Sequence, residues 1–113
     1  DGRAVRGCLM LAVQTDGTEI RTVESLAQGN TAHPLQKAFQ DHHGLQCGYC
    51  TAGILMTLVD FLANNPTPEE SELKNALSGN LCRCTGYQNI FSAAKDGAER
   101  LRIEEHSDDD IRR

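Results

Sequence analysis

The segments Cys47-Gly-Tyr-Cys50 and Cys82-Arg-Cys84 carry four of the five cysteines of this chain, in two close pairs separated by residues 51–81. Two tight thiol pairs of this kind predict a compact inorganic centre held by four thiolates. Zinc ribbons usually combine two C-x2-C pairs across ~15–20 residues, so a C-x-C second pair is unusual for zinc. The spacing favours a [2Fe–2S] cluster, and a four-thiolate zinc site stays open as the structural alternative.

Two other interpretations of the cysteines fit the sequence less well. A secreted disulfide scaffold usually has an even number of cysteines, whereas this chain has five, with four of them in close pairs. A dithiol redox motif would explain Cys47 and Cys50 but would ignore the second pair. No histidine stands at ligand spacing from either pair, and His42 and His43 fit a solvated helix end better than a metal site.

Four helical patterns surround the cysteine pairs. They cover about Pro34–His43, Thr51–Asn64, a segment from a Thr67-Pro68 start to Gly79, and about Gln88–Arg102. Their apolar faces predict a core made of the following residues: Leu35, Ala38, Phe39, Ile54, Leu55, Leu58, Val59, Leu62, Leu73, Ala76, Leu77, Ile90, Phe91, Ala94, Ala98 and Leu101. The fold class is therefore mainly α.

The first pair falls just before the second helix, and the other falls between the third and fourth. Helix starts offer unpaired N–H groups and a partial positive charge, which stabilise thiolates and an anionic cluster.

Residues 1–27 have a different character and are β-prone. Thr18 to Val23 alternates as a strand does, and Asp16-Gly17 is a turn signal. Two strands do not make a stable sheet alone, so this segment is expected to be the end of a β-rich domain. The predicted organisation is therefore 1–27, a helical domain over 28–105, and an acidic tail over 106–113 that is expected to be disordered.

The segments 45–51 and 79–87, with His33-Pro34-Leu35-Gln36 and Asn64-Asn-Pro66-Thr67, resemble the xanthine dehydrogenase family of molybdenum hydroxylases. The resemblance covers about residues 1–103 and points to the small iron–sulfur subunit of heterotrimeric members, such as the carbon monoxide dehydrogenases. It departs from the family at Ala52, where members commonly carry Pro. Ala is a good helix former, so no loss of the site is expected.

The resemblance implies a helical domain that binds one [2Fe–2S] cluster, after a ferredoxin-like domain that binds another. Cys47, Cys50, Cys82 and Cys84 match the ligands of the helical cluster. Cys8 matches the last ligand of the first cluster, whose other three ligands would precede Asp1. By the same resemblance Gln46 contacts the molybdopterin of the large subunit, and Cys84 is the ligand nearest that pterin.

The function implied is the relay of single electrons from a molybdenum–pterin site on a large subunit to an FAD on a medium subunit. No residue of this chain is then expected to transform substrate. Arg83, between two ligands, either tunes the cluster or meets a partner. The alternatives are a stand-alone ferredoxin-like carrier and a zinc-stapled interaction module.

The composition sets limits on location and partners. The net charge is −5, which argues against a broad basic surface for nucleic acid. No apolar run approaches the ~18 residues that cross a bilayer, so no membrane insertion is expected. A cytoplasmic location is expected.

Overall fold

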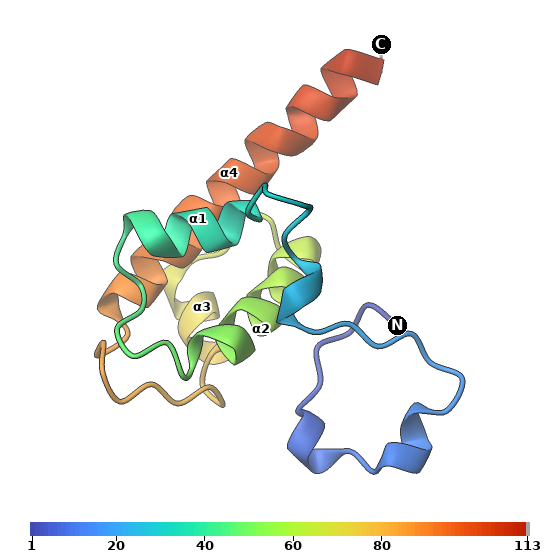
Figure 1. Ribbon diagram of the computed structural model, residues 1–113. Helices are drawn as coiled ribbons and strands as arrows, with labels where there is room; N and C mark the ends of the chain where they lie inside the picture. The colour runs from blue at the N-terminus through green and yellow to red at the C-terminus, as the bar shows by residue number, and fades with distance from the viewer. Residues whose placement is uncertain (113) are drawn as a thin grey trace.

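The computed structural model describes residues 1–112, with side chains described through residue 104. Four α-helices make up the body: α1 (Pro34–Asp41), α2 (Thr51–Asn64), α3 (Glu70–Ala76) and α4 (Gln88–Arg112) (Figure 1). Over residues 1–112 the backbone forms no β-strand, only one isolated bridge between Gln28 and Thr31. The mainly α class expected from the sequence is confirmed.

The core lies between α1, α2 and α4, with α3 closing one side. Its fully buried large side chains are Phe39, Leu35, Ile54, Leu58, Leu73 and Ile90. The apolar faces predicted for the helices therefore form the core, while Val59, Ala76, Phe91 and Leu101 are only partly buried. The helices form because these faces can be buried together, which contributes most of the stability of a small helical domain.

Gly97 is explained by the contact between α1 and α4. A Cβ at this position would overlap Cδ2 of Leu35 and lie 3.2 Å from its Cγ. The residue that weakens α4 as an isolated helix is thus the one that lets α1 approach it closely.

The helix bounds agree with the sequence in α2 and in the start of α1. Pro34 occupies the first turn of α1, and Nδ1 of His33 accepts a hydrogen bond from the N–H of Leu35 at 3.1 Å. Helix α1 ends at Asp41, slightly before the predicted end at His43, which has a positive φ of 54°.

The predicted start of α3 at Thr67 and Pro68 was wrong. The helix begins at Glu70. The N–H of Glu69 donates to Oε1 of Glu72 at 3.0 Å, which closes a capping box that starts after the predicted N-cap Thr67. Glu69 and Glu72 form this box, although Glu is a weaker N-cap residue than Thr.

The predicted end of α4 near Arg102 was also wrong. The helix continues to Arg112 because the segment after Arg102 contains neither Gly nor Pro to stop it. The acidic segment 106–113, expected as a separate disordered tail, is continuous with α4 through Arg112, and its side chains and Arg113 lie outside the described residues.

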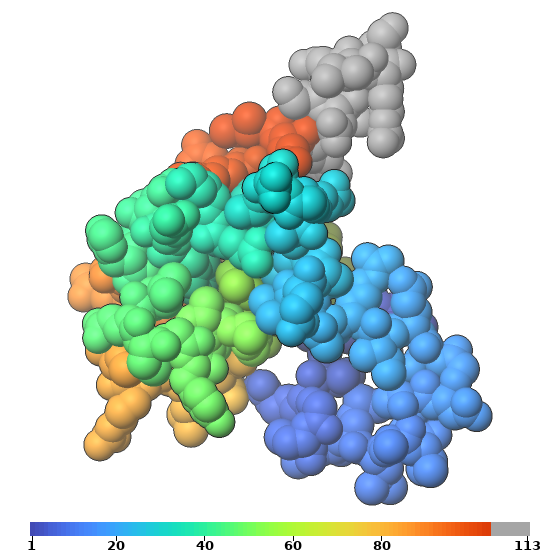
Figure 2. All heavy atoms as spheres, in the orientation of Figure 1, coloured from blue at the N-terminus to red at the C-terminus, as the bar shows by residue number. Residues whose placement is uncertain are grey.

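The strand predicted over Thr18 to Val23 is absent, so this prediction was wrong. Residues 1–27 instead form three 3-10 turns, Gly7–Leu9, Ala12–Thr15 and Val23–Ser25, joined by extended chain. A strand requires hydrogen bonds to a neighbouring strand, and the segment 1–27 lies beside the helical body without a paired strand among the described residues (Figures 1 and 2). The assignment of 1–27 to a separate domain stays a prediction.

Among the described residues, each helix is either too short or too polar to cross a lipid bilayer.

Candidate metal centre

The fold brings the two cysteine segments together. Cys50 is the N-cap residue of α2, and Cys82 and Cys84 lie in the loop that joins α3 to α4. The Sγ of Cys84 donates to the Sγ of Cys47 across 3.5 Å. The thiols of Cys50 and Cys82 also share a hydrogen bond. Each contact joins one thiol from the first segment to one from the second.

This pairing favours two metal ions over one. Two thiolates at about 2.3 Å from a tetrahedral metal lie about 3.7 Å apart, close to the distance between Cys47 and Cys84. Within residues 1–104, no three cysteine, histidine or acidic side chains converge as a single-ion site requires. Two pairs, each able to hold one iron, match a [2Fe–2S] cluster better than a single zinc.

The loop that carries Cys82 is closed by Tyr87. The N–H of Cys82 donates to the phenol oxygen of Tyr87 at 2.8 Å, and the phenol donates to the carbonyl of Asn80 at 3.1 Å. Tyr87 adopts a φ of 71°, and Gly86 before it a φ of 66°. A left-handed conformation at a tyrosine costs about 1–2 kcal/mol, and the two hydrogen bonds of the phenol hold it in place.

Cys50 and Cys82, the inner pair of thiols, have pKa values shifted in opposite directions. Burial is the largest influence on Cys50 and, with its hydrogen bond to Cys82, raises the pKa of its thiol to about 11. Burial acts in the same direction at Cys82. There the hydroxyl of Thr85, at 3.1 Å from Sγ, and the Thr85 backbone N–H outweigh it and lower the pKa to about 7.

Cys47 and Cys84, the outer pair of thiols, also have pKa values shifted in opposite directions. The backbone N–H of Tyr49 is the main cause of the lowered pKa of Cys47, and the hydrogen bond from Cys84 adds to it. That same bond raises the pKa of Cys84. Each pair thus offers one easily formed thiolate and one retained proton, which a binding metal ion would displace.

One buried hydroxyl supports the presence of a further group. Oγ1 of Thr51 is enclosed without a hydrogen-bond partner, and it is the one such side-chain atom found among the described residues. Thr51 is the first residue of α2, next to Cys50. A buried hydroxyl without a partner costs about 1–3 kcal/mol, and a sulfur atom of an anionic cluster would be able to accept a hydrogen bond from it. The donor set and this orphan hydroxyl both fit a [2Fe–2S] cluster.

The surface beside the outer pair is open. Cys47, Cys84, Gln46 and Arg83 are all exposed. The sequence-predicted residues Gln46 and Arg83 therefore lie on the surface, at the rim of the thiol site.

An apolar rim of Leu45, Tyr49 and Leu81 borders the same residues, and the sequence interpretation missed it. Tyr49 is 96% exposed and Leu81 is 84% exposed. A sequence signal was available: both side chains are large and apolar, both sit next to ligand positions, and neither belongs to a helical face. Exposed apolar groups gathered at one site are typical of a surface that another molecule covers.

Cys8 stands apart from the other four cysteines. It is exposed in the 3-10 turn Gly7–Leu9 and is a free thiol. Its role as a ligand of another cluster stays a prediction. His42, expected at a solvated helix end, contacts Asp96 through Nε2 at 2.8 Å.

A mainly α domain with two facing pairs of thiols defines a class of protein, the helical iron–sulfur domains. In agreement, the family described as "[2Fe-2S] binding domain" matches residues 22–95. The chain belongs to this family, and its resemblance to the small iron–sulfur subunits of the molybdenum hydroxylases is confirmed.

Individual relatives extend the comparison. The nicotine 6-hydroxylase small subunit of Paenarthrobacter nicotinovorans is 59% identical over 101 residues, which is 89% of this chain and 61% of the relative. The caffeine dehydrogenase subunit gamma of a Pseudomonas strain is 51% identical over 84% of this chain and 59% of its own length. The chain thus spans about three fifths of these curated relatives.

Solved structures show the same fold. Quinoline 2-oxidoreductase from Pseudomonas putida 86 superimposes with a TM-score of 0.86 at 50% identity, over 91% of this chain and 65% of that one. Aldehyde oxidoreductase from Desulfovibrio gigas gives a TM-score of 0.85 at 34% identity, over 92% of this chain and 12% of that one. Several relatives are named as subunits, so related chains work in multi-subunit complexes.

Proposed function

We propose that this chain is the electron-transfer component of a multi-subunit molybdenum hydroxylase. The observation that carries the proposal is the meeting of Cys47 with Cys84 and of Cys50 with Cys82 at the start of α2, next to an exposed rim. When bound there, a [2Fe–2S] cluster would accept and release one electron at a time. The four thiols would hold it, and the N–H groups at the start of α2 would stabilise its negative charge.

The metal content tests this proposal. The assembled protein should contain iron and acid-labile sulfide in a ratio near one to one, with a red-brown absorbance that dithionite bleaches. Replacing Cys82 by Ser should lower the iron content of the helical site without adding zinc. A single stoichiometric zinc in a colourless chain would instead identify the zinc-stapled module.

The partners proposed are a large subunit that carries molybdopterin and a medium subunit that carries FAD. The apolar rim and the exposure of Gln46 and Cys84 support a covered surface at this point. The amide of Gln46 offers a donor and an acceptor to the edge of a pterin. A cytoplasmic location is part of the proposal, because five free thiols suit a reducing compartment.

A variant separates the pterin contact from the metal site. Gln46→Leu should leave the visible spectrum of the cluster intact while slowing its reduction by substrate in the assembled enzyme. Gln40→Leu, an exposed glutamine on α1 away from the thiols, is the matched control. Normal turnover of Gln46→Leu would exclude the pterin contact. A monomeric, fully loaded chain without a partner would favour the stand-alone carrier.

Cys8 is proposed as a ligand of a second cluster, with its other ligands supplied from outside this chain. Its exposure and its freedom from the other four thiols support this role. The assembled protein should then hold two distinguishable [2Fe–2S] signals.

A further inference from the structure

The hydroxyl of Thr85 lies between a backbone amide and a ligand thiol. Its Oγ1 accepts a hydrogen bond from the N–H of Tyr87 at 3.1 Å, and the same oxygen is 3.1 Å from the Sγ of Cys82. An N–H group can only donate, so the hydroxyl uses a lone pair on Tyr87 and keeps its own proton for another acceptor. Among the described residues, the sulfur of Cys82 is that acceptor.

This hydroxyl is held in place from several sides. Threonine is branched at Cβ, which restricts rotation about χ1. Thr85 is half-buried, and the phenol of Tyr87 accepts a hydrogen bond from the N–H of Cys82 at 2.8 Å. Both ends of the contact between Thr85 and Cys82 are therefore attached to the same tyrosine. The contact is part of the ligand loop and does not depend on a long, exposed side chain.

Cys82 is the one ligand thiol that has a hydrogen bond to a hydroxyl among residues 1–104. The hydrogen bonds of Cys47, Cys50 and Cys84 involve backbone N–H groups and other thiols. Binding of iron removes the thiol protons, so the bonds from one thiol to another are lost. A thiolate sulfur can still accept the proton of a hydroxyl, so the bond from Thr85 is compatible with a bound metal.

We propose that Thr85 is a positioning residue that sets the reduction potential of the [2Fe–2S] cluster through its hydrogen bond to the Sγ of Cys82. This inference rests on the proposed function. Reduction adds one electron, supplied by dithionite in the experiment below, and changes no covalent bond. A hydrogen bond to a ligand sulfur stabilises the reduced state, which carries one more negative charge. The potential is therefore higher with this bond than without it.

The experiment measures the midpoint potential of the helical cluster in the assembled enzyme, by EPR during a dithionite titration. The signal of this cluster is the one that Cys82→Ser changes. Thr85→Val keeps the branched shape of the side chain but has no proton to donate. At the wild-type midpoint, its ratio of reduced to oxidised cluster should fall by about threefold to tenfold, which is a potential ~30–60 mV lower at ~59 mV per tenfold change. Thr85→Ser retains a hydroxyl and should restore the wild-type potential.

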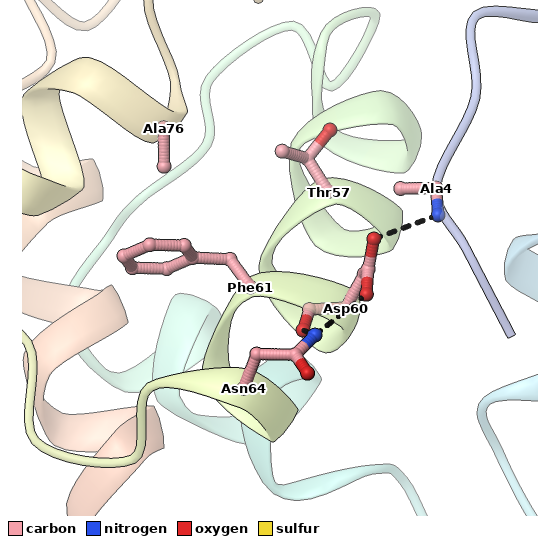
Figure 3. A pocket seen from close by; sticks show the side chains of 6 residues that line it. All are labelled: Ala4, Thr57, Asp60, Phe61, Asn64 and Ala76. Atoms are coloured by element: carbon pink, nitrogen blue, oxygen red, sulfur yellow. Dashed lines mark hydrogen bonds between the residues drawn. The ribbon is translucent and has the colours of Figure 1, made fainter.

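Two controls separate this effect from loosening of the loop. Tyr87→Phe removes the phenol from the N–H of Cys82 and leaves the hydroxyl of Thr85, so a chelator should remove iron faster while the potential stays at the wild-type value. Thr57 lines a pocket beside α2, as Figure 3 shows, and its hydroxyl donates to the carbonyl of Gly53 at 2.9 Å. Thr57→Val makes the same chemical change as Thr85→Val without affecting a ligand sulfur, and should keep the wild-type potential.

The outcomes separate this inference from the proposed function. A wild-type potential in Thr85→Val, with the cluster bound, overturns the role of Thr85 and leaves the proposed function standing. Equal shifts in Thr85→Val and Tyr87→Phe would indicate a general loosening of the loop and also overturn it. If Thr85→Val binds no cluster, the smaller Thr85→Ala takes its place in the titration. If no [2Fe–2S] signal changes in Cys82→Ser, the proposed function fails, and this inference fails with it.

Discussion

The thiols of Cys82 and Cys50 share a hydrogen bond but differ in pKa. Cys82 receives hydrogen bonds from Thr85, which lower its pKa, whereas burial raises the pKa of Cys50. The pKa of Cys82 is lowered to about 7 and that of Cys50 is raised to about 11. The thiolate is the nucleophile in alkylation, so the two residues should react at different rates.

In the folded chain freed of metal, iodoacetamide should label Cys82 before Cys50 at neutral pH. The rate at Cys82 should rise as the pH passes about 7 and then level, whereas Cys50 should stay slow until the pH approaches about 11. Peptide mass mapping over a pH series measures both rates. Thr85→Val removes the hydroxyl donor and should shift the profile of Cys82 to higher pH. Equal rates for Cys50 and Cys82 at pH 7 would contradict this assignment.

The hydroxyl of Tyr87 joins two backbone groups of the ligand loop, while its ring stacks on Phe91. Tyr87→Phe keeps the ring but leaves the N–H of Cys82 and the carbonyl of Asn80 without their partner. We expect a loss of about 1–2 kcal/mol in the free energy of unfolding, together with faster loss of iron to a chelator. Chelator-competition kinetics measure the second effect. Tyr49→Phe, a change at a fully exposed ring, should leave both quantities unchanged, and an equal effect of the two changes would exclude the loop-closing role.

At the scale of elements, the contact between α1 and α4 depends on a missing side chain. Gly97→Ala should help α4 as an isolated helix by ~1 kcal/mol. The added methyl group would overlap Leu35, and overpacking of this kind typically costs about 1–3 kcal/mol. We expect net destabilisation, measured by urea unfolding. Leu35→Ala removes a buried side chain and is itself destabilising by about 2–5 kcal/mol. The double variant should lose less stability than the sum of the two single variants, because the smaller side chain removes the overlap, and simple additivity of the two changes would contradict the overlap.

The same two helices are tied by charge at their exposed edge. Arg100 on α4 contacts Asp41 at the end of α1 and Asp96 on its own helix, each at 2.8 Å. The hydrogen bond from Arg100 is the main cause of the lowered pKa of Asp41. Burial acts to raise the pKa of Asp96, but its bonds to Arg100 and His42 outweigh burial and lower it.

These lowered pKa values predict a loss of stability in acid. A carboxyl group with a folded-state pKa below its ordinary 3.8 stabilises the fold above that pH, and the contribution is lost as the pH falls through the lowered value. Arg100→Ala should therefore lower the melting temperature at pH 7 and have little effect well below pH 3.8. Thermal unfolding across pH 2–7, with the exposed Arg3→Ala as control, measures this. A pH-independent difference would show that Arg100 acts through packing alone.

At the scale of the whole molecule, the exposed apolar groups are unevenly placed. Tyr49 and Leu81 directly precede the ligand positions Cys50 and Cys82, whereas Val13 and Ile20 belong to the N-terminal segment. The face around the four thiols therefore combines metal ligands, polar groups and apolar area, as an interface does.

Changing the apolar rim should weaken assembly and spare the fold. Tyr49→Ser with Leu81→Ser should reduce co-purification of the other subunits by at least about tenfold, which corresponds to ~1.4 kcal/mol. Ile103→Ser, at a residue 62% exposed on α4, is the matched control. Size-exclusion chromatography measures assembly, and circular dichroism measures the fold. Full assembly of the double variant would place the interface elsewhere.

The sequence determined the parts of this protein that depend on local pattern. Apolar spacing specified four helices and most of the core. A helix that buries one face needs apolar residues at regular intervals, and these intervals are visible in the sequence. The spacing of Cys47, Cys50, Cys82 and Cys84 indicated the type of centre, because metal ligation is a matter of residue type and short-range reach. The family was visible for the same reason.

The tertiary structure decided what depends on contacts between distant residues. The structure places the N-cap of α3 at Glu69 and not at Thr67. The absence of a strand at 18–23 followed from the lack of a paired strand in the described chain. The pairing of Cys47 with Cys84, the need for glycine at residue 97, and the different pKa values of the thiols all require atoms far apart in sequence to meet. The local sequence pattern does not determine these long-range contacts, because they depend on how the helices pack.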